Sequence, residues 1–241
     1  MFEKECAFIW RLQIPFENLT TSVFLIETEQ GYLLFDCACG DADVDGYILP
    51  ALRELGVPFS SIRWLFCSHS HADHAGGTER ILKCLPNVQT EADLPDCLQA
   101  IPLPGHTLDC RGLMDMRTRT LLSGDGLQFC GIGRFGCGLH SVCAYRKTLR
   151  RIHQEAPLTI LASHDYVPFG NRADGVQQVN RWIEHCKEYT DEIAAHVHKC
   201  LARGIGNSSE ITDLFRAAHL DLPPVHEVTI QSVMREEKSE K

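Results

Sequence analysis

Four side chains that can bind a metal lie within six consecutive residues of this chain, in the segment His69-Ser70-His71-Ala72-Asp73-His74. Imidazole suits zinc, and the carboxylate of Asp73 adds a harder oxygen ligand. On a turn after a strand, His69 and His71 could serve one metal while Asp73 and His74 serve a neighbouring one. A polar turn without any ligand role is the alternative, which three histidines and an aspartate in six positions disfavour.

Three later segments place further ligand-capable side chains at the ends of expected strands. His106 follows Pro104-Gly105, Asp125 ends the strand at 120–123, and His164 follows an apolar strand at 158–162. A single histidine at a strand end is more often a hydrogen-bonded surface residue. Taken with the histidine motif, however, these residues give seven ligands at strand termini, where an open α/β scaffold places its site.

The elements that must position these residues alternate between strands and helices. Apolar or β-branched segments predict strands at 6–14, 21–28, 32–36, 62–67, 88–91, 98–103, 113–116, 120–123 and 158–162. Apolar side chains three or four residues apart predict helices at about 44–55, 142–156, 175–203 and 208–219, with a short helix before Pro86. The charged tail at 236–241 is expected to fray.

Length and charge narrow the class of protein. The 241 residues suffice for one large α/β domain or two small ones, and the net charge is −9. An acidic surface repels phosphate backbones and anionic lipids, which disfavours nucleic acid and membranes as partners. The N-terminus lacks a signal-peptide pattern, and no stretch approaches the ~18 apolar residues of a membrane span. With twelve scattered cysteines read as reduced thiols, we expect a cytoplasmic protein.

The motifs resemble those of metallo-β-lactamase-superfamily hydrolases, over about residues 8–167. The resemblance includes the end of the strand at 32–36, the segment Ser68 to Gly77, Pro104-Gly105-His106-Thr107, Leu121 to Asp125, and His164. It implies an α/β fold, the four-layer αββα sandwich, with His69, His71 and His106 on one metal. Asp73, His74 and His164 would hold the second metal, and Asp125 would bridge the two. The change to helical periodicity adds a C-terminal extension at 171–241, packed on a catalytic domain at 1–170.

The occupied Asp125 position resembles that of glyoxalase II-like and lactonase-like members. The resemblance therefore implies hydrolysis of an ester, thioester, lactone or related acyl bond of a small molecule. Two divalent cations, zinc first with iron or manganese as alternatives, would share a hydroxide nucleophile that Asp73 orients. Three other functions stay open: a mononuclear iron enzyme similar to sulfur dioxygenases, a phosphodiesterase, and a non-catalytic metal-binding protein of the same fold.

Candidate substrate contacts are Arg134 and Phe135, in the glycine-rich stretch after Asp125, and Tyr166. Arg134 could meet a substrate carboxylate, Phe135 could form an apolar wall, and Tyr166 could donate to an oxyanion. A surface loop and a packed tyrosine are the alternatives. The apolar faces of the C-terminal helices are expected to pack against the sandwich, with a cap over the cleft or a homodimer surface as the alternative.

Overall fold

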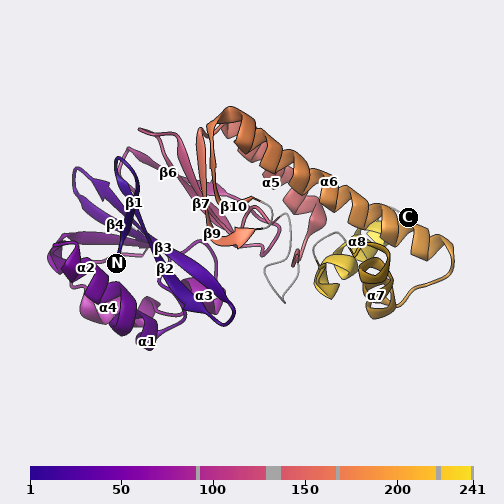
Figure 1. The fold of residues 1–241 in the computed structure, drawn as a ribbon, viewed down its shortest axis with the longest axis horizontal. Helices are drawn as coiled ribbons and strands as arrows, with labels where there is room; N and C mark the ends of the chain where they lie inside the picture. The colour runs from indigo at the N-terminus through magenta and orange to yellow at the C-terminus, as the bar shows by residue number, and fades with distance from the viewer. Residues whose placement is uncertain (91–92, 129–136, 167–168, 221–223, 240–241) are drawn as a thin grey trace. The chain divides into compact units, whose positions relative to one another are not determined.

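The computed structural model describes residues 1–90, 93–128, 137–166, 169–220 and 224–239. The chain divides into two compact units, whose elements are labelled in Figure 1. The first unit comprises Met1–Ile101 with Leu113–Thr120, and the second comprises Pro102–Gly112 with Leu121–Lys241. The expected division at residue 170 stays a prediction.

Five strands form the sheet of the first unit, in the order β1-β2-β3-β4-β5. Strands β1 to β4 pair antiparallel, whereas β4 and β5 are parallel and therefore need a crossover connection between them. The strands are β1 (Glu3–Cys6), β2 (Ile9–Phe16), β3 (Leu19–Thr28), β4 (Gly31–Phe35) and β5 (Ile62–Phe66). The strand expected at 6–14 is thus divided between β1 and β2.

The crossover from β4 to β5 is helical, as the periodicity predicts, but it is not a single α-helix. It consists of α1 (Asp41–Asp43), the π-helix η1 (Val44–Ile48), α2 (Leu49–Glu54) and the 3₁₀-helix η2 (Phe59–Ser61). Pro50 explains the π-helical segment, because its ring lacks an N–H and clashes with the carbonyl four residues earlier.

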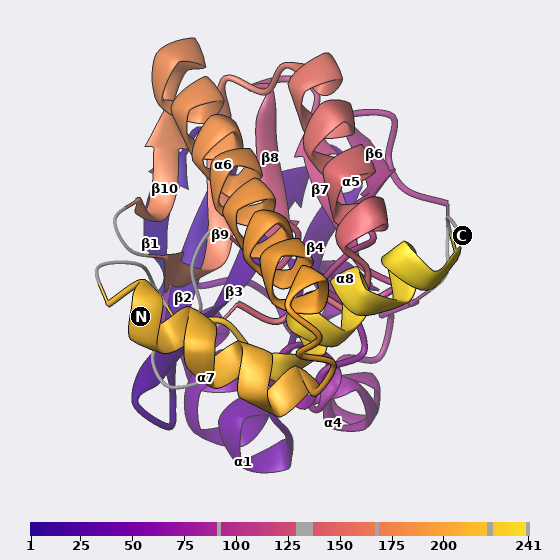
Figure 2. The same cartoon turned by 90° about the vertical axis from the view of Figure 1, so that its right-hand side faces the viewer.

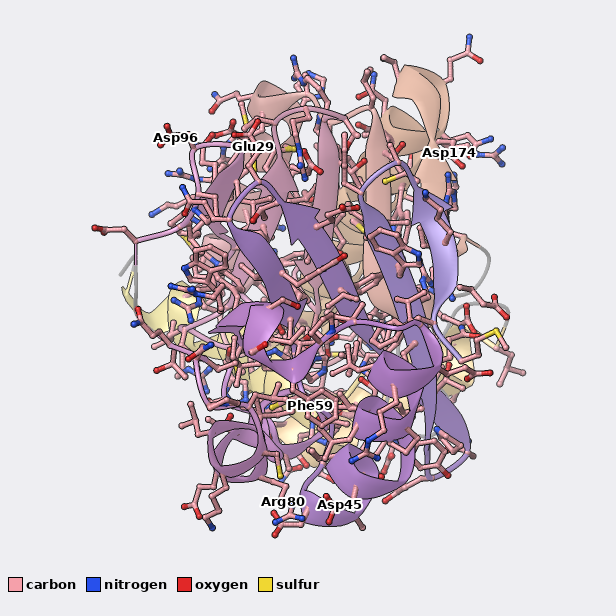
Figure 3. The ribbon with its side chains drawn as sticks, turned by 90° about the vertical axis from the view of Figure 1, so that its left-hand side faces the viewer. Glu29, Asp45, Phe59, Arg80, Asp96 and Asp174 are labelled. Carbon is pink, nitrogen blue, oxygen red and sulfur yellow. The ribbon has the colours of Figure 1, made fainter. Side chains whose placement is uncertain are left out.

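The core of the first unit lies between this sheet and its helices. After β5 the chain forms α3 (Ala72–Ala75) and α4 (Thr78–Cys84). Side chains of one sheet face pack against the helical crossover and α4 in a buried cluster that includes Val23, Leu25, Leu34, Leu65, Ile48, Leu52 and Ile81. On the surface, Arg80 of α4 forms a two-armed ion pair with Asp45 of η1, both arms 2.9 Å long (Figure 3).

The loop after β4 has an unusual backbone. Asp36 and Ala38 have φ angles of 63° and 59°, in the left-handed region that non-glycine residues avoid. Backbone hydrogen bonds hold the loop against the segment around α3, from Cys37 N to His74 O at 2.8 Å and from Gly77 N to Ala38 O at 3.1 Å. These bonds keep the buried Asp36 side chain next to the histidine motif.

A second sheet has the order β10-β9-β8-β7-β6. Its strands are β6 (Leu98–Pro102), β7 (Arg111–Asp115), β8 (Thr120–Gly124), β9 (Thr159–Tyr166) and β10 (Gly170–Asp174). In the part of 88–91 that the structure describes, the expected strand is only an isolated bridge of Gln89 to Trp64. This segment follows Pro86, which has no N–H for a ladder. The strand expected at 158–162 is longer, so His164 lies within it.

The helices of the second unit are α5 (Val142–Glu155), α6 (Gly175–Ala202), α7 (Ser208–Ala218) and α8 (Glu227–Ser239). Figure 2 shows α5 and α6 side by side across the strands, and α8 contacts α5, α6 and α7. Ser141 and Asn207 begin α5 and α7 by accepting N-cap hydrogen bonds from Ala144 and Glu210. Among the described residues, no helix combines the length and apolar character that crossing a membrane requires.

Candidate metal centre

The histidine motif lies where β5 gives way to α3 in the first unit. His69 is in the connecting loop, His71 is the N-cap residue of α3, and Asp73 and His74 lie within that short helix. His69, Asp73 and His74 are buried, with 3%, 9% and 0% of their surface exposed. A buried polar group is costly unless it is hydrogen-bonded, so the partners of these side chains define what they can do.

The carboxylate of Asp36 determines the proton arrangement of His74. Asp36 is fully buried and accepts from the Ser68 N–H at 2.6 Å, from the Ser68 hydroxyl at 3.0 Å and from Nδ1 of His74 at 2.8 Å. Because a carboxylate only accepts, Nδ1 of His74 carries the proton and Nε2 of the neutral ring keeps a lone pair. That Nε2 lies 3.3 Å from Oδ2 of Asp73.

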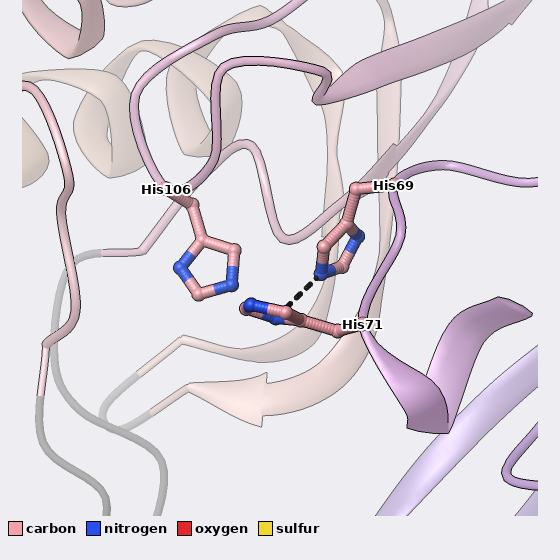
Figure 4. Close-up of side chains that lie close together, drawn as sticks. All are labelled: His69, His71 and His106. Atoms are coloured by element: carbon pink, nitrogen blue, oxygen red, sulfur yellow. Dashed lines mark hydrogen bonds between the residues drawn. The ribbon is translucent and has the colours of Figure 1, made fainter. Parts of the chain in front are cut away.

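The same carboxylate acts on His69 through Ser68. The Ser68 hydroxyl donates its hydrogen to Asp36, so it accepts from Nδ1 of His69, 3.0 Å away. This leaves the lone pair of His69 on Nε2, which lies 2.9 Å from Nδ1 of His71, the contact that is dashed in Figure 4. The motif therefore presents imidazole nitrogens whose other ring positions are already bonded.

The second unit contributes His106, Asp125 and His164, which are 8%, 4% and 1% exposed. Nδ1 of His106 donates to the carbonyl of Gly138 at 2.6 Å, which leaves the lone pair of the neutral ring on Nε2. The two Asp125 oxygens are divided between the two histidines: Oδ2 lies 3.5 Å from Nε2 of His106, and Oδ1 lies 3.4 Å from Nε2 of His164.

The Asp125 carboxylate is itself held in place by two neutral donors. Nε2 of Gln128 lies 3.3 Å from Oδ2, and the hydroxyl of Tyr166 lies 3.2 Å from Oδ1. Both donor side chains are buried, so bulk water does not compete with them for the carboxylate. Each oxygen of Asp125 thus has a neutral donor as its partner, and a carboxylate held in this way can also serve as a metal ligand.

This set of donors fits divalent cations that accept nitrogen and oxygen ligands. Imidazole Nε2 atoms lie 3.3–3.5 Å from carboxylate oxygens, a spacing that a proton or a cation between the two atoms would stabilise. Ligands about 2.1 Å from one zinc ion in a tetrahedral site are ~3.4 Å apart, which is the same spacing. The bonded Nδ1 positions complete the pattern, because metal-binding histidines usually donate their other N–H to a carboxylate or carbonyl.

Each unit gathers part of the expected ligand set. The first unit holds His69, His71, Asp73 and His74 close together, and the second holds His106, Asp125 and His164. The assignment of these seven residues to two metal ions stays a prediction.

The expected substrate contacts differ in their outcome. Arg134 and Phe135 lie outside the described residues. Tyr166 is fully buried and its hydroxyl bonds to Asp125, one of the expected ligands. Its contact with substrate stays a prediction. Asp36 and Ser68 lie in the motifs that carry the family resemblance, but the sequence alone assigns them no role. The signal that could have identified Asp36 is a carboxylate at the end of a buried strand.

Comparison with known proteins gives a family match around the histidine motif. A family model described as the metallo-beta-lactamase superfamily matches residues 17–91, which include the histidine motif. The "Beta-lactamase-like protein 2 homolog" of Caenorhabditis elegans is 26% identical over 204 residues, covering 74% of this chain and 66% of that protein. The uncharacterized Bacillus subtilis protein YobT is 24% identical over 165 residues, covering 51% of this chain and 69% of that protein. The chain thus spans about two thirds of the length of these curated relatives.

Solved structures show the same fold. A metallo-beta-lactamase family protein from Thermus thermophilus superposes with a TM-score of 0.60 at 17% identity, covering 95% of this chain and 94% of that chain. A metallo-beta-lactamase from Pontibacter korlensis gives a TM-score of 0.58 at 15% identity, covering 78% and 98%. Residues 17–91 thus match the metallo-β-lactamase superfamily, and the solved structures share the fold over most of the chain. The expected α/β sandwich with C-terminal helices is confirmed.

Proposed function

We propose that this protein is a hydrolase that binds two divalent cations, zinc first, and cleaves an ester, thioester, lactone or related acyl bond of a small molecule. One observation carries the proposal. His74 and His106 each have Nδ1 bonded to a fixed acceptor while Nε2 faces a carboxylate oxygen. The bonded Nδ1 fixes each ring, as in metal-binding histidines, and the carboxylate oxygen near Nε2 can serve as a second ligand of the same cation.

The proposal assigns His69, His71 and His106 to one cation, and Asp73, His74 and His164 to the other. Asp125 would hold both cations, a role supported by the division of its two oxygens between His106 and His164. Bound cations of this kind lower the pKa of a shared water towards neutrality and polarise a carbonyl oxygen. The twelve cysteines, which suit a reducing compartment, support a cytoplasmic location as part of the proposal.

Asp73 is the residue that we assign to proton handling. Its side chain is 12% exposed, whereas the Asp36 side chain is sealed at 0%. The backbone carbonyl of Asp73 accepts from the Thr21 hydroxyl at 3.3 Å, which ties the start of α3 to β3. A carboxylate with a fixed backbone and partial access can orient the attacking water, take its proton and return that proton to the leaving group.

Metal content is the measurement that tests the proposal first. We expect elemental analysis of protein purified without chelators or a His-tag to find about two zinc ions per chain. A panel of lactones, thioesters, aryl esters, β-lactams and phosphodiesters then identifies the bond that is cleaved. One iron per chain together with oxygen consumption would indicate dioxygenase chemistry instead. Cleavage of phosphodiesters alone would indicate a phosphodiesterase. A chain that binds no metal after reconstitution contradicts it.

A further inference from the structure

We propose that the C-terminal helix α8 orients the ligands His106 and Asp125, through Thr229 and Gln128 acting as positioning residues. This inference rests on the function proposed above, because it concerns two ligands of the same metal centre. It adds a part of the chain that lies far from every ligand in sequence and that none of the ligand motifs includes.

The peptide of Gly138 joins the two ligands. Its carbonyl accepts from Nδ1 of His106 at 2.6 Å, and its N–H donates to Oε1 of Gln128 at 3.1 Å. The other end of the same side-chain amide donates from Nε2 to Oδ2 of Asp125. Because Oε1 must face the N–H donor, the amide group has only one orientation, and a shift of the Gly138 peptide moves the partners of both ligands.

Burial and further hydrogen bonds hold Gln128 in place. It is only 3% exposed. Its backbone carbonyl accepts from the hydroxyl of Tyr145, at 2.7 Å, and from the thiol of Cys137, at 3.8 Å. Tyr145 is fully buried on α5. Gln128 therefore transmits the position of Gly138 to Asp125 instead of adapting to it.

The hydroxyl of Thr229 holds both neighbours of Gly138. It donates to the carbonyl of Cys137 at 2.7 Å and accepts from the N–H of Leu139 at 2.8 Å. Thr229 is fully buried in α8, so water cannot replace either bond.

The segment that leads into α8 also forms hydrogen bonds with Cys137. The N–H of Cys137 donates to the carbonyl of Pro224 at 2.8 Å, and the N–H of His226 donates to the carbonyl of Cys137 at 3.0 Å. Backbone bonds before the helix and a side-chain bond from within it thus fix the chain on one side of Gly138. The orientation of the Gly138 carbonyl, which His106 needs, follows from α8.

A second hydroxyl on α8 provides a matched control. Ser232 is 2% exposed and accepts from the N–H of Val142 at 2.8 Å, at the start of α5. Like Thr229, it is a buried hydroxyl that joins α8 to another segment by a backbone N–H. It makes none of the hydrogen bonds that hold Gln128 or the 137–139 segment, so its loss tests the packing of α8 alone.

The experiment compares Thr229→Val, Thr229→Ser and Ser232→Ala by metal affinity, measured by competition with a chromophoric chelator, and by thermal unfolding. We expect Thr229→Val to weaken zinc binding by about 10-fold or more, as is usual for loss of a partner behind a ligand. Thr229→Ser, which keeps the hydroxyl, should stay within about twofold of the wild type. Ser232→Ala should lower the unfolding temperature as Thr229→Val does while leaving zinc affinity unchanged.

A second measurement needs no metal. In metal-free protein labelled with ¹⁵N-histidine, long-range ¹H–¹⁵N correlation spectra report whether His106 carries its proton on Nδ1. We expect that Nδ1–H signal in the wild type and in Ser232→Ala, and its loss or shift in Thr229→Val. Unchanged affinity and an unchanged His106 signal in Thr229→Val would overturn the positioning role while leaving the proposed function intact. A wild-type chain that binds no zinc would overturn the proposed function, and the His106 spectra would still decide the hydrogen-bond relay.

Discussion

The buried carboxylate of Asp36 holds Ser68 by two hydrogen bonds, one from its backbone N–H at 2.6 Å and one from its hydroxyl at 3.0 Å. Asp36 fixes the proton of His74 on Nδ1 directly, and it fixes the proton of His69 on Nδ1 through the Ser68 hydroxyl. One side chain thus determines which nitrogen each of these two proposed ligands would present to a cation.

The first prediction concerns this carboxylate. Asp36→Asn should weaken metal binding by about 10- to 100-fold, because the amide has one acceptor oxygen where the carboxylate has two and adds a donor that opposes the existing ones. Chelator competition measures the affinity. Asp115→Asn is the control, since Asp115 is equally buried but bonds to Arg117, and it should leave metal affinity unchanged. Equal affinities in the two variants would remove Asp36 from the metal centre.

Asp73→Asn tests proton handling. We expect this variant to fold and to lose about 10²- to 10⁴-fold in kcat, the usual contribution of a general acid or base. Circular dichroism and metal content should be recorded beside the rate on whichever acyl substrate the panel identifies. Asp45→Asn removes an exposed carboxylate of the same unit and should leave kcat as it is. A near-normal kcat in Asp73→Asn would exclude the assigned role.

Asp125→Ala tests the bridge. Removing a carboxylate that serves both cations should lower metal content from about two ions per chain to one or fewer. Asp165→Ala is the control, because Asp165 is exposed on β9 beside the buried His164 and should not alter metal content. Retention of two tightly bound ions in Asp125→Ala would contradict the bridging position.

Metal removal should lower thermal stability. An ion present at 100 times its dissociation constant stabilises the folded state by about 2.7 kcal/mol, which for a chain of this size is about 5–10 °C in Tm. Differential scanning calorimetry with zinc and with a chelator measures the difference. The difference should be smaller in Asp125→Ala, and an equal Tm under both conditions in the wild type would argue against a cation bound to the native state.

The pH dependence of one surface pair follows from its geometry. Arg172 donates to Asp174 at 2.6 and 3.0 Å, and this hydrogen bonding lowers the pKa of the Asp174 carboxyl from its ordinary value. A lowered folded-state pKa gives stability that is present above the ordinary pKa near 4 and is lost as the pH falls through the folded value. Arg172→Gln should therefore lower the free energy of unfolding at pH 7 by less than about 1 kcal/mol, because the pair is partly exposed. In urea titrations, a difference that persists undiminished at pH 2.5 would refute this account.

The part of the site that could be predicted from sequence consists of residues whose chemistry is local. The histidine motif needs only six residues to be recognised, and the loops after apolar strands lead to His106 and Asp125. The supporting residues have no such signal, because their partners are distant: Thr229 bonds to residues about 90 positions away. A hydrogen bond of this kind is selected by tertiary structure, which periodicity does not encode.

Strand β10 and helix α8 are among the elements that escaped prediction, for related reasons. Strand β10, Gly170–Asp174, contains Gly-Asn-Arg-Ala-Asp, which shows neither alternation nor β-branched residues. Helix α8 places Thr229 and Ser232 on its buried face beside Ile230 and Val233, so polar residues interrupt the apolar stripe that would mark it as a helix. The hydroxyls that bond to the 137–142 segment are therefore the reason that the helix was hard to predict.

The position of α8 in the chain has a consequence for how the protein is made. All seven ligand residues precede it, so a ribosome releases them before the helix that fixes the Gly138 peptide. At about 5–20 residues per second, Thr229 is synthesised several seconds after His164. During that interval the nascent chain carries its histidines and carboxylates without the contacts that orient His106 and Asp125. On the proposed function, the two metals would therefore bind only after this helix, the last of the described elements, has docked.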